Sequence, residues 1–275
     1  LKVATTAADN ICSSSQDVGR REQQLMPLGW QHRFTMTIED QPTLRLLHGF
    51  AQSRACWGPV EGLLATGRVI EALDLPGHGA GGPAADGWTT ADRLGSAPAT
   101  DWLGYSLGGR MLLHLLLAHP EVVRRAVLIG ATGGIEDPAE RRARAADDEV
   151  LAQRIEHEGV DAFVERWLAM PMWAGLPEWA KFSQERRTNT ATGLAGSLRL
   201  AGTGAQDNLW PRLVEIDTPV LVLAGEHDEK FTSIGQRLAA ELPQGQFRSV
   251  PGAGHATHLE GPNRTATLVT SWLNS

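Results

Sequence analysis

The sequence predicts an α/β fold with a mostly parallel central sheet, flanking helices and one helical insertion. From about residue 33 onward, short apolar segments alternate with helical patterns, as they do in βαβ units. Several of these segments are apolar throughout and end at glycine, which is typical of strands buried on both faces. Between two of them, more than 80 residues show no strand pattern. A connection that long is expected to contain helices of its own.

Six segments are expected to form the strands of this sheet. They are residues 43–47, 68–74, 101–104, 125–130, 219–225 and, more weakly, 246–250. A convincing helix pattern covers 107–119 and is closed by Pro120, and an amphipathic helix is expected at 263–273.

The long connection begins with a clear helix start. Asp137 suits the N-cap, Pro138 the first helical position and Glu140 the capping-box position. Helices are expected to about residue 157, over 160–169, and within 178–200. Four of the nine tryptophans fall in this stretch, namely Trp167, Trp173, Trp179 and Trp210. A helical insertion rich in aromatic residues predicts a lid over a pocket.

Three regions are therefore expected along the chain. Residues 1–30 are predicted to be a flexible tail, because they are polar and lack the apolar segment of a signal peptide. Residues 31–134 and 213–275 are predicted to form the α/β core, and 135–212 the helical lid.

Composition limits the possible partners. The chain has 275 residues and a net charge of −7, which argues against nucleic acid or an anionic membrane as a partner and leaves a small molecule. An anionic substrate would need a local cluster of cations. The two cysteines, Cys12 and Cys56, are too few for a disulfide framework and fit a reducing, cytoplasmic compartment. No apolar run approaches the ~20 residues of a membrane span.

The most informative motif is Gly-Tyr-Ser-Leu-Gly at 104–108, between an expected strand and an expected helix. A tight strand-to-helix turn with small residues on either side exposes the Ser106 hydroxyl near backbone N–H donors. Five matching residues alone are a weak signal, and Ser106 could be an ordinary turn residue.

Further catalytic groups follow other strands. Serine catalysis needs an imidazole to take the proton and an acid to orient that imidazole. Asp228 follows the segment 219–225, and His255 follows the last strand in a Gly-His turn. Loops at the carboxyl ends of parallel strands meet at one edge, so we predict a triad of Ser106, Asp228 and His255.

Alternatives to two triad members lie close by in the sequence. His258 competes with His255, although a loop histidine is more easily aimed at the serine. Glu226 and Glu229 compete with Asp228, and this acidic stretch could simply pair with Lys230 at the surface.

The remaining elements of the site are backbone groups. The amides of Phe50 and Leu107 are expected to form an oxyanion hole. Both His48 and His78 are expected to be structural. No set of His, Cys and carboxylate residues has metal-ligand spacing, so neither a metal nor a cofactor is expected.

Taken together, these motifs resemble the α/β-hydrolase superfamily and, more narrowly, the 2-succinyl-6-hydroxy-2,4-cyclohexadiene-1-carboxylate (SHCHC) synthases of menaquinone biosynthesis. The segments that carry the resemblance are 48–50, 74–79, 104–110, 225–231 and 254–255. Its more selective parts are Arg110, residues 140–144, Trp167 with Pro171, Arg187 with Asn189, and residues 202–206.

The resemblance implies an elimination rather than a hydrolysis. Ser106, activated by His255, would remove a proton from a substrate with three carboxylates, and pyruvate would leave. Five residues match the family's substrate-binding positions: Tyr105, Arg110, Arg144, Trp167 and Arg187. A guanidinium suits this role because it makes two parallel bonds to a carboxylate.

Other interpretations stay open. Arg144 has Glu140 and Asp148 four residues to either side, the spacing of helix-surface ion pairs. The same triad would serve a carboxylesterase with Ser106 as nucleophile. The Gly-, Ala- and Pro-rich segment 81–99, with polar residues in the first strands, predicts a trimmed or loosely packed front half and suggests a non-catalytic binding protein.

Overall fold

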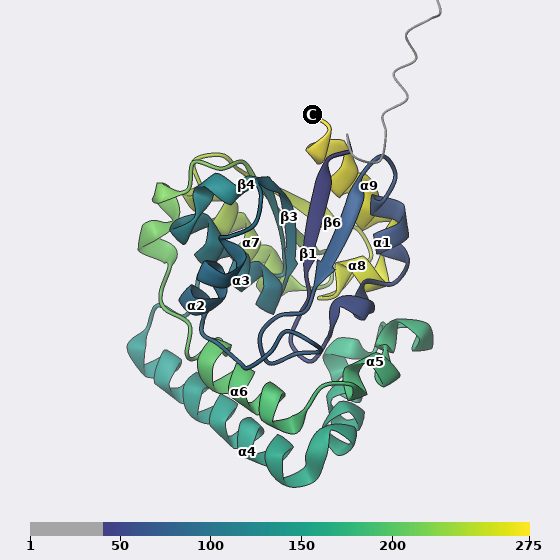
Figure 1. Ribbon diagram of the computed structural model, residues 1–275, viewed down its shortest axis with the longest axis vertical. Helices are drawn as coiled ribbons and strands as arrows, with labels where there is room; N and C mark the ends of the chain where they lie inside the picture. The colour runs from purple at the N-terminus through teal and green to yellow at the C-terminus, as the bar shows by residue number, and fades with distance from the viewer. Residues whose placement is uncertain (1–40) are drawn as a thin grey trace, which may run out of the picture. The chain divides into compact units, whose positions relative to one another are not determined.

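The computed structural model describes residues 41–275, so the predicted tail at 1–30 lies outside the described residues. A six-stranded sheet in the order β2-β1-β3-β4-β5-β6 forms the centre, and every pair of neighbouring strands is parallel. The strands are β1 (Thr43–Leu47), β2 (Val69–Leu73), β3 (Thr100–Tyr105), β4 (Val123–Ile129), β5 (Val220–Gly225) and β6 (Gly245–Val250). The predicted α/β class and all six predicted strands are confirmed (Figure 1).

Helices cover both faces of the sheet and create two apolar cores. On one face, α2 (Gly87–Leu94), α3 (Leu107–Ala118) and α7 (Glu229–Glu241) pack on the strands. On the other face lie α1 (Pro59–Leu64), α8 (Thr257–Glu260) and α9 (Pro262–Leu273). Strand β1 shows the alternation behind this division, because Leu47 belongs to the first core while Leu44 and Leu46 belong to the second.

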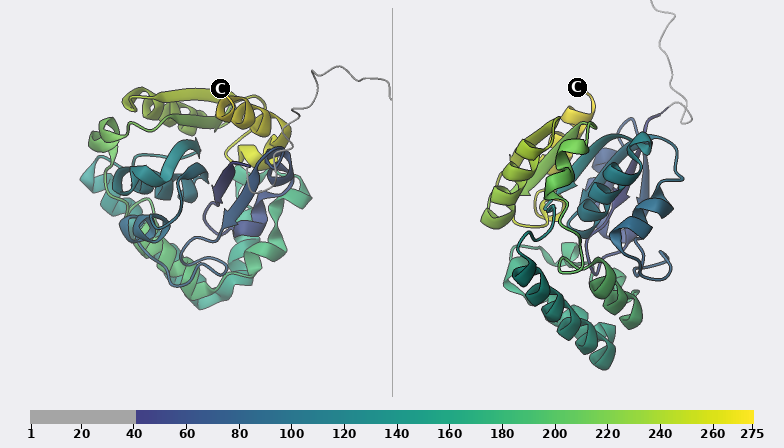
Figure 2. Two further views of the ribbon diagram at one scale, coloured as in Figure 1. Left: turned by 45° about the horizontal axis from the view of Figure 1, so that its top comes forward. Right: turned by 90° about the vertical axis from the view of Figure 1, so that its left-hand side faces the viewer.

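The insertion between β4 and β5 contains no strand and, apart from residues 210–215, which pack beside α7, gathers at the end of the molecule away from the C-terminus (Figures 1 and 2). It contains the helices α4 (Pro138–Leu168), α5 (Ser183–Arg187) and α6 (Ala191–Ala201) and the 3₁₀ segments η4 (Pro171–Trp173), η5 (Glu178–Lys181) and η6 (Trp210–Glu215). Asp137 caps α4 as predicted, since its carboxylate accepts the N–H groups of Ala139 and Glu140. Gly159, at φ 81°, divides α4 close to the predicted break.

The expectation of a loosely packed front half is wrong. Within the segment expected to be irregular, α2 forms with Asp86 as its N-cap and packs against α3. The helix is short, and its glycine and threonines are poor helix formers, so its pattern was weak.

The polar residues of the first strands are also satisfied. Asp101 of β3 forms a buried ion pair with Arg68 at 2.9 Å. Arg45 of β1 pairs with Glu71 of β2 at 2.7 Å, and its guanidinium lies over the ring of Trp102 on β3. Each charge therefore has a partner, which removes most of the cost of placing it in the sheet.

Candidate active site

Ser106 occupies the turn between β3 and α3 in a strained conformation. Its φ of 50° and ψ of −106° are rare for a residue with a side chain. Glycines on both sides make the turn possible. A Cβ on Gly104 would lie 2.5 Å from the Gly108 carbonyl oxygen, and a Cβ on Gly108 would lie 2.0 Å from the Leu47 oxygen. The fold therefore stabilises a conformation that the serine alone would avoid, which is common at functional sites.

Asp228 and His255 meet although 27 residues separate them. The His255 Nδ1 atom lies 2.7 Å from the Asp228 Oδ2 atom, and both side chains are largely buried. Burial by itself would raise the pKa of Asp228, but hydrogen bonds from His255 and from the Phe231 amide bring it below its usual value. An ionised Asp228 orients the ring and favours a proton on Nδ1, which leaves Nε2 free to accept one.

The alternative residues have other partners. Glu226 is exposed and accepts the Gly252 N–H at 2.8 Å, while Glu229 begins α7. His258 is buried, neither of its ring nitrogens has a hydrogen-bond partner among residues 41–275, and burial lowers its pKa to about 3. The geometry thus favours Asp228 and His255 over these neighbours.

The end of β4 connects the serine to the histidine. The Ser106 N–H donates to the Ile129 oxygen at 2.8 Å, and a Cβ on the following residue, Gly130, would lie 3.0 Å from the His255 ring. Within residues 41–275, no hydrogen bond joins the Ser106 hydroxyl to His255. Such bonds are often long until substrate binds.

Two amides near Ser106 are free to bind an anion. Among the residues from 41 onward, neither the Phe50 nor the Leu107 N–H donates to another group. The neighbouring Gly108 amide is occupied, because it donates to the His48 oxygen at 3.0 Å. The chain therefore leaves available the two donors that the sequence predicts for an oxyanion hole.

Two buried histidines hold the Phe50 loop. His48 Nε2 accepts the Leu75 N–H at 3.0 Å, and His78 Nε2 accepts the Ala51 N–H at 3.2 Å. Burial lowers the pKa of His48 to about 4 and that of His78 to about 3. Both are neutral acceptors at pH 7, which fits the structural role expected for them.

Arg110 is buried in the first turn of α3. Its Nη1 atom donates to the Ala201 oxygen at 2.7 Å and to Gln206 Oε1 at 3.1 Å. Burial, and then the nearby charge of Arg144, lower the pKa of Arg110 to about 10. Arg144 itself is 45% exposed and pairs with Asp148 at 2.8 Å, the helix-surface pair that its spacing suggested.

The structure does not bring Arg187 to the other predicted residues. Arg187 pairs with Asp161 at 3.2 Å and lies near the Ser183 oxygen, and none of its polar contacts is with a predicted site residue. Its neighbour Arg186 is fully buried instead, and donates to the Ala51 oxygen at 3.1 Å.

Arg186 is the residue that sequence reasoning missed. Its guanidinium lies 5.7 Å from the Trp173 ring, and its Nη2 atom has no partner among the described residues. Burial raises the pKa of Tyr105, and the charge of Arg186 is close enough to oppose that rise. The only signal in the sequence was the pair of adjacent arginines in a region predicted to be helical. Adjacent helical residues point about 100° apart, so one of the two can face inward, but the sequence does not say which.

Aromatic side chains extend from the core loop through the insertion to the histidine. The ring of Trp167 lies 5.6 Å from that of Phe50 and 6.0 Å from that of Trp173. The His255 ring lies 6.4 Å from Trp173 and 5.5 Å from Tyr105. The indole N–H groups of Trp167 and Trp173 are buried and have no hydrogen-bond partner among the described residues.

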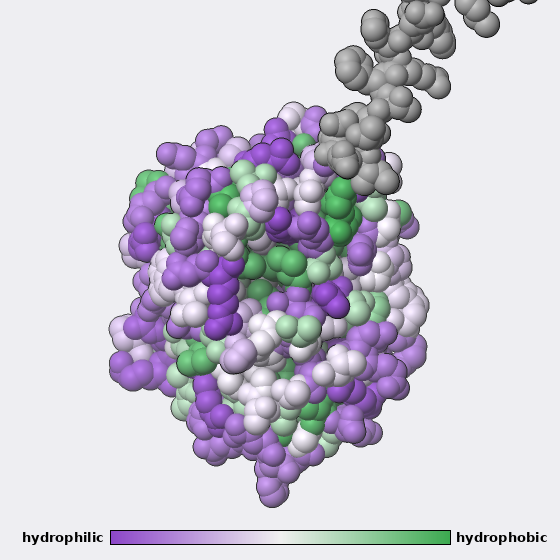
Figure 3. Space-filling view, viewed as in Figure 1, coloured by the Kyte–Doolittle hydropathy of each residue, from purple (hydrophilic) through white to green (hydrophobic). Residues whose placement is uncertain are grey.

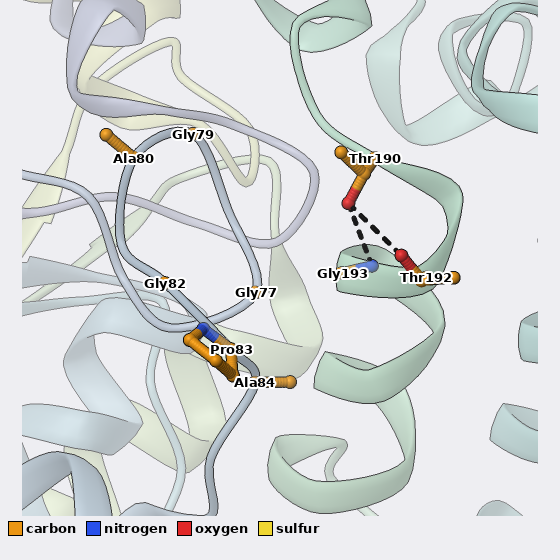
Figure 4. A pocket seen from close by; sticks show the side chains of 9 residues that line it. All are labelled: Gly77, Gly79, Ala80, Gly82, Pro83, Ala84, Thr190, Thr192 and Gly193. Atoms are coloured by element: carbon orange, nitrogen blue, oxygen red, sulfur yellow. Dashed lines mark hydrogen bonds between the residues drawn. The ribbon is translucent and has the colours of Figure 1, made fainter.

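A separate cavity of about 520 Å³ lies between the loop 77–84 and the start of α6 (Figure 4). Its lining is small and uncharged. The Thr190 hydroxyl there accepts the Gly193 N–H at 3.0 Å and so caps α6. The cavity contains none of the predicted catalytic residues and is not the candidate active site.

Residues 41–275 offer neither a metal site nor a membrane-spanning helix. No group of three or more His, Cys, Asp or Glu side chains there could hold a metal ion. No helix in that part of the chain is long and apolar enough to cross a membrane.

Hydrophilic residues cover most of the face shown in Figure 3, and hydrophobic ones gather in a hollow near its centre.

The fold and the strained serine define a class of protein. A family model described as the α/β-hydrolase fold matches residues 42–262, which include all six strands and the predicted triad. The chain belongs to this family.

Within the family, the chain is a relative of the SHCHC synthases. It is 36% identical to a protein of Bacillus subtilis (strain 168) that is provisionally named as such a synthase, over 83% of this chain and 89% of that protein. It is 31% identical to the synthase of Enterobacter sp. (strain 638), over 83% and 90% of the two chains. The solved structure of MenH from S. aureus has a TM-score of 0.79, with 27% identity over 85% of this chain and 93% of that chain.

Proposed function

We propose that this chain is an SHCHC synthase, which eliminates pyruvate from a cyclohexene intermediate of menaquinone biosynthesis that carries three carboxylates. The observation that carries this proposal is a pair of buried arginines without carboxylate partners. Neither Arg110 nor Arg186 pairs with an acid among residues 41–275. A buried guanidinium is costly unless an anion compensates it, as Asp101 does for Arg68. A carboxylate-bearing substrate would supply that anion.

In this proposal the triad acts as a base. His255, oriented by Asp228, takes the Ser106 proton as the Ser106 oxygen removes a proton from the substrate carbon. The electron pair moves through the ring and breaks the C–O bond to the enolpyruvyl group, which leaves as an enolate and becomes pyruvate when it takes up the proton held by His255. Negative charge develops on the substrate as the proton leaves, and the amides of Phe50 and Leu107 stabilise it.

The remaining side chains would bind the substrate. Arg110, Arg144 and Arg186 would hold carboxylates, and Tyr105 and Trp167 would pack on the ring. Arg187 matches the family motif, but its pairing with Asp161 supports it less well than Arg186. The cations also resolve the problem that a chain of net charge −7 poses for a trianion.

We also infer a cytoplasmic enzyme that works on a small molecule, without nucleic acid or a membrane as partner. The acidic charge and the low cysteine content support this inference.

The test is a comparison of substrates with purified protein. We expect release of pyruvate from the tricarboxylate intermediate, and a loss of several orders of magnitude in kcat in Ser106→Ala. The strained turn that carries Ser106 and the free amides of Phe50 and Leu107 would equally serve a serine that attacks an ester. Hydrolysis of p-nitrophenyl esters with no turnover of the tricarboxylate would replace the proposal with a carboxylesterase, and inactivity on both would indicate a binding protein.

A further inference from the structure

The carboxylate of Glu260 bonds to the backbone on both sides of His255. Its Oε2 atom accepts the Gly254 N–H at 2.6 Å, and its Oε1 atom accepts the Ala256 N–H at 2.9 Å. The Glu260 side chain therefore holds the two backbone amides, of Gly254 and Ala256, that flank His255.

Local structure explains how the side chain reaches these amides. Glu260 ends the short helix α8, one turn beyond Ala256, so its side chain can return along the helix to the turn before it. Gly254 gives the carboxylate its space, because a Cβ there would lie 2.8 Å from Oε2. The Gly-His turn and the glutamate five residues after the histidine thus form one unit.

Glu260 has no ion-pair partner among the described residues, and its charge otherwise adds only to the raised pKa of the buried Tyr105. The Glu260 side chain is half-buried, and among residues 41–275 its carboxylate accepts only these two bonds. Bonds from amides to a carboxylate are charge-assisted and about twice as strong as neutral ones. A half-buried carboxylate that accepts two backbone N–H groups therefore restricts the His255 turn more than a surface salt bridge would.

The insertion reaches the same carboxylate. A Cβ on Gly175, just after η4, would lie 3.5 Å from Glu260 Oε2, and Trp173 of η4 lies 6.4 Å from the His255 ring. The turn that carries His255 is therefore bordered by Glu260 of α8 on one side and by the insertion, through Trp173 and Gly175, on another.

We propose that Glu260 is a positioning residue for His255. By fixing the peptide units before and after the histidine, it keeps Nδ1 of the ring at 2.7 Å from Asp228. This inference rests on the base role proposed for His255. A misplacement of about 1 Å at a catalytic group can cost roughly 100-fold in rate, so the loop position matters for turnover.

The chain offers a matched control in Glu226. Its carboxylate accepts the Gly252 N–H at 2.8 Å, so it anchors the same turn, but three residues before the histidine. Glu226→Gln and Glu260→Gln make the same chemical change in two side chains that bind backbone amides of the same loop. Only the second disturbs a bond next to His255.

The experiment measures kcat and KM for pyruvate release in Glu260→Ala, Glu260→Gln, Gly254→Ala and Glu226→Gln. We expect kcat to fall about 100-fold in Glu260→Ala and about 10-fold in Glu260→Gln and Gly254→Ala, with KM nearly unchanged. Glu226→Gln should keep kcat within about two-fold. Circular dichroism verifies folding, and Glu260→Gln provides the test if Glu260→Ala does not fold.

Two readouts do not depend on the natural substrate. The first is the downfield proton resonance of His255 Nδ1–H, which should broaden or disappear in Glu260→Ala and remain in Glu226→Gln. The second is the rate at which a fluorophosphonate labels Ser106, which should fall in parallel with kcat. They separate a failure of this inference from a failure of the elimination reaction. An unchanged resonance with an unchanged labelling rate in folded Glu260→Ala, or equal losses in the two Glu→Gln variants, would overturn the proposal.

Discussion

Arg110 and Arg186 show how a side chain's surroundings decide its role. Both are buried, and both use part of their guanidinium on backbone oxygens rather than on acids. Arg144 and Arg187 have the same chemistry, but each is partly exposed and paired with an aspartate. The Arg187–Asp161 pair lies at the surface and contributes little, whereas the Arg144 pair has a buried carboxylate, which holds that guanidinium on Asp148. The unpaired, buried guanidiniums are therefore the stronger candidates for binding an anion.

Substitution of the adjacent arginines separates these roles. Arg186→Ala should raise KM for the tricarboxylate by roughly 100-fold, because loss of a buried charge pair costs about 2–5 kcal/mol. Arg187→Ala is the matched control and should change KM less than about three-fold, since its pair with Asp161 is exposed. Steady-state kinetics of both variants provide the measurement. A larger effect from Arg187 would restore that residue to the substrate site.

At the level of elements, the serine turn depends on backbone contact between β1, β3 and α3. The Gly104 and Gly108 backbones approach each other and Leu47 too closely for any side chain. The alternation of apolar segments was sufficient to predict β3 and α3. The same alternation could not predict α2, because this helix contains residues with low helix propensity. Its capping residue Asp86 and its contacts with α3 stabilise it instead.

Two glycine-to-alanine changes should have opposite effects on stability. Gly108→Ala would place a Cβ 2.0 Å from a backbone oxygen, and we expect a loss of about 3 kcal/mol or more in the free energy of unfolding. Gly62→Ala, at an exposed position of α1 where a Cβ would have nothing within 4 Å, should instead gain up to about 1 kcal/mol. Urea unfolding of both variants measures the difference. Similar effects from the two changes would contradict the close approach at Gly108.

For the molecule as a whole, burial lowers the pKa of four histidines, and the three with the largest shifts, His48, His78 and His258, predict a steep dependence of stability on pH. Burial lowers the pKa of His48 to about 4 and those of His78 and His258 to about 3, from 6.5 in the exposed state. Above pH 6.5 they are neutral in both states and contribute no pH dependence. Below it the unfolded chain binds protons that the folded chain does not, so acid favours unfolding.

Between about pH 7 and pH 5, each of these histidines should therefore remove about 2 kcal/mol from the free energy of unfolding. Urea titrations at the two pH values measure the sum. In His258→Phe the dependence should fall by about a third, and no side-chain hydrogen bond is lost because neither ring nitrogen has a partner. Equal stability at the two pH values would mean that the histidines are protonated in the folded protein.

The sequence alone predicted where the strands lie along the chain and which candidate catalytic residues follow them. Hydrophobic period and turn residues are local properties, and parallel strands bring their carboxyl ends to one edge whatever the details of packing. The pairing of Asp228 with His255 follows from that geometry. Only the tertiary structure decided which arginine is buried and which carboxylate holds the His255 turn. Each of these depends on a rotation of about 100° or a shift of a few ångströms between segments far apart in the chain, to which local sequence patterns are insensitive.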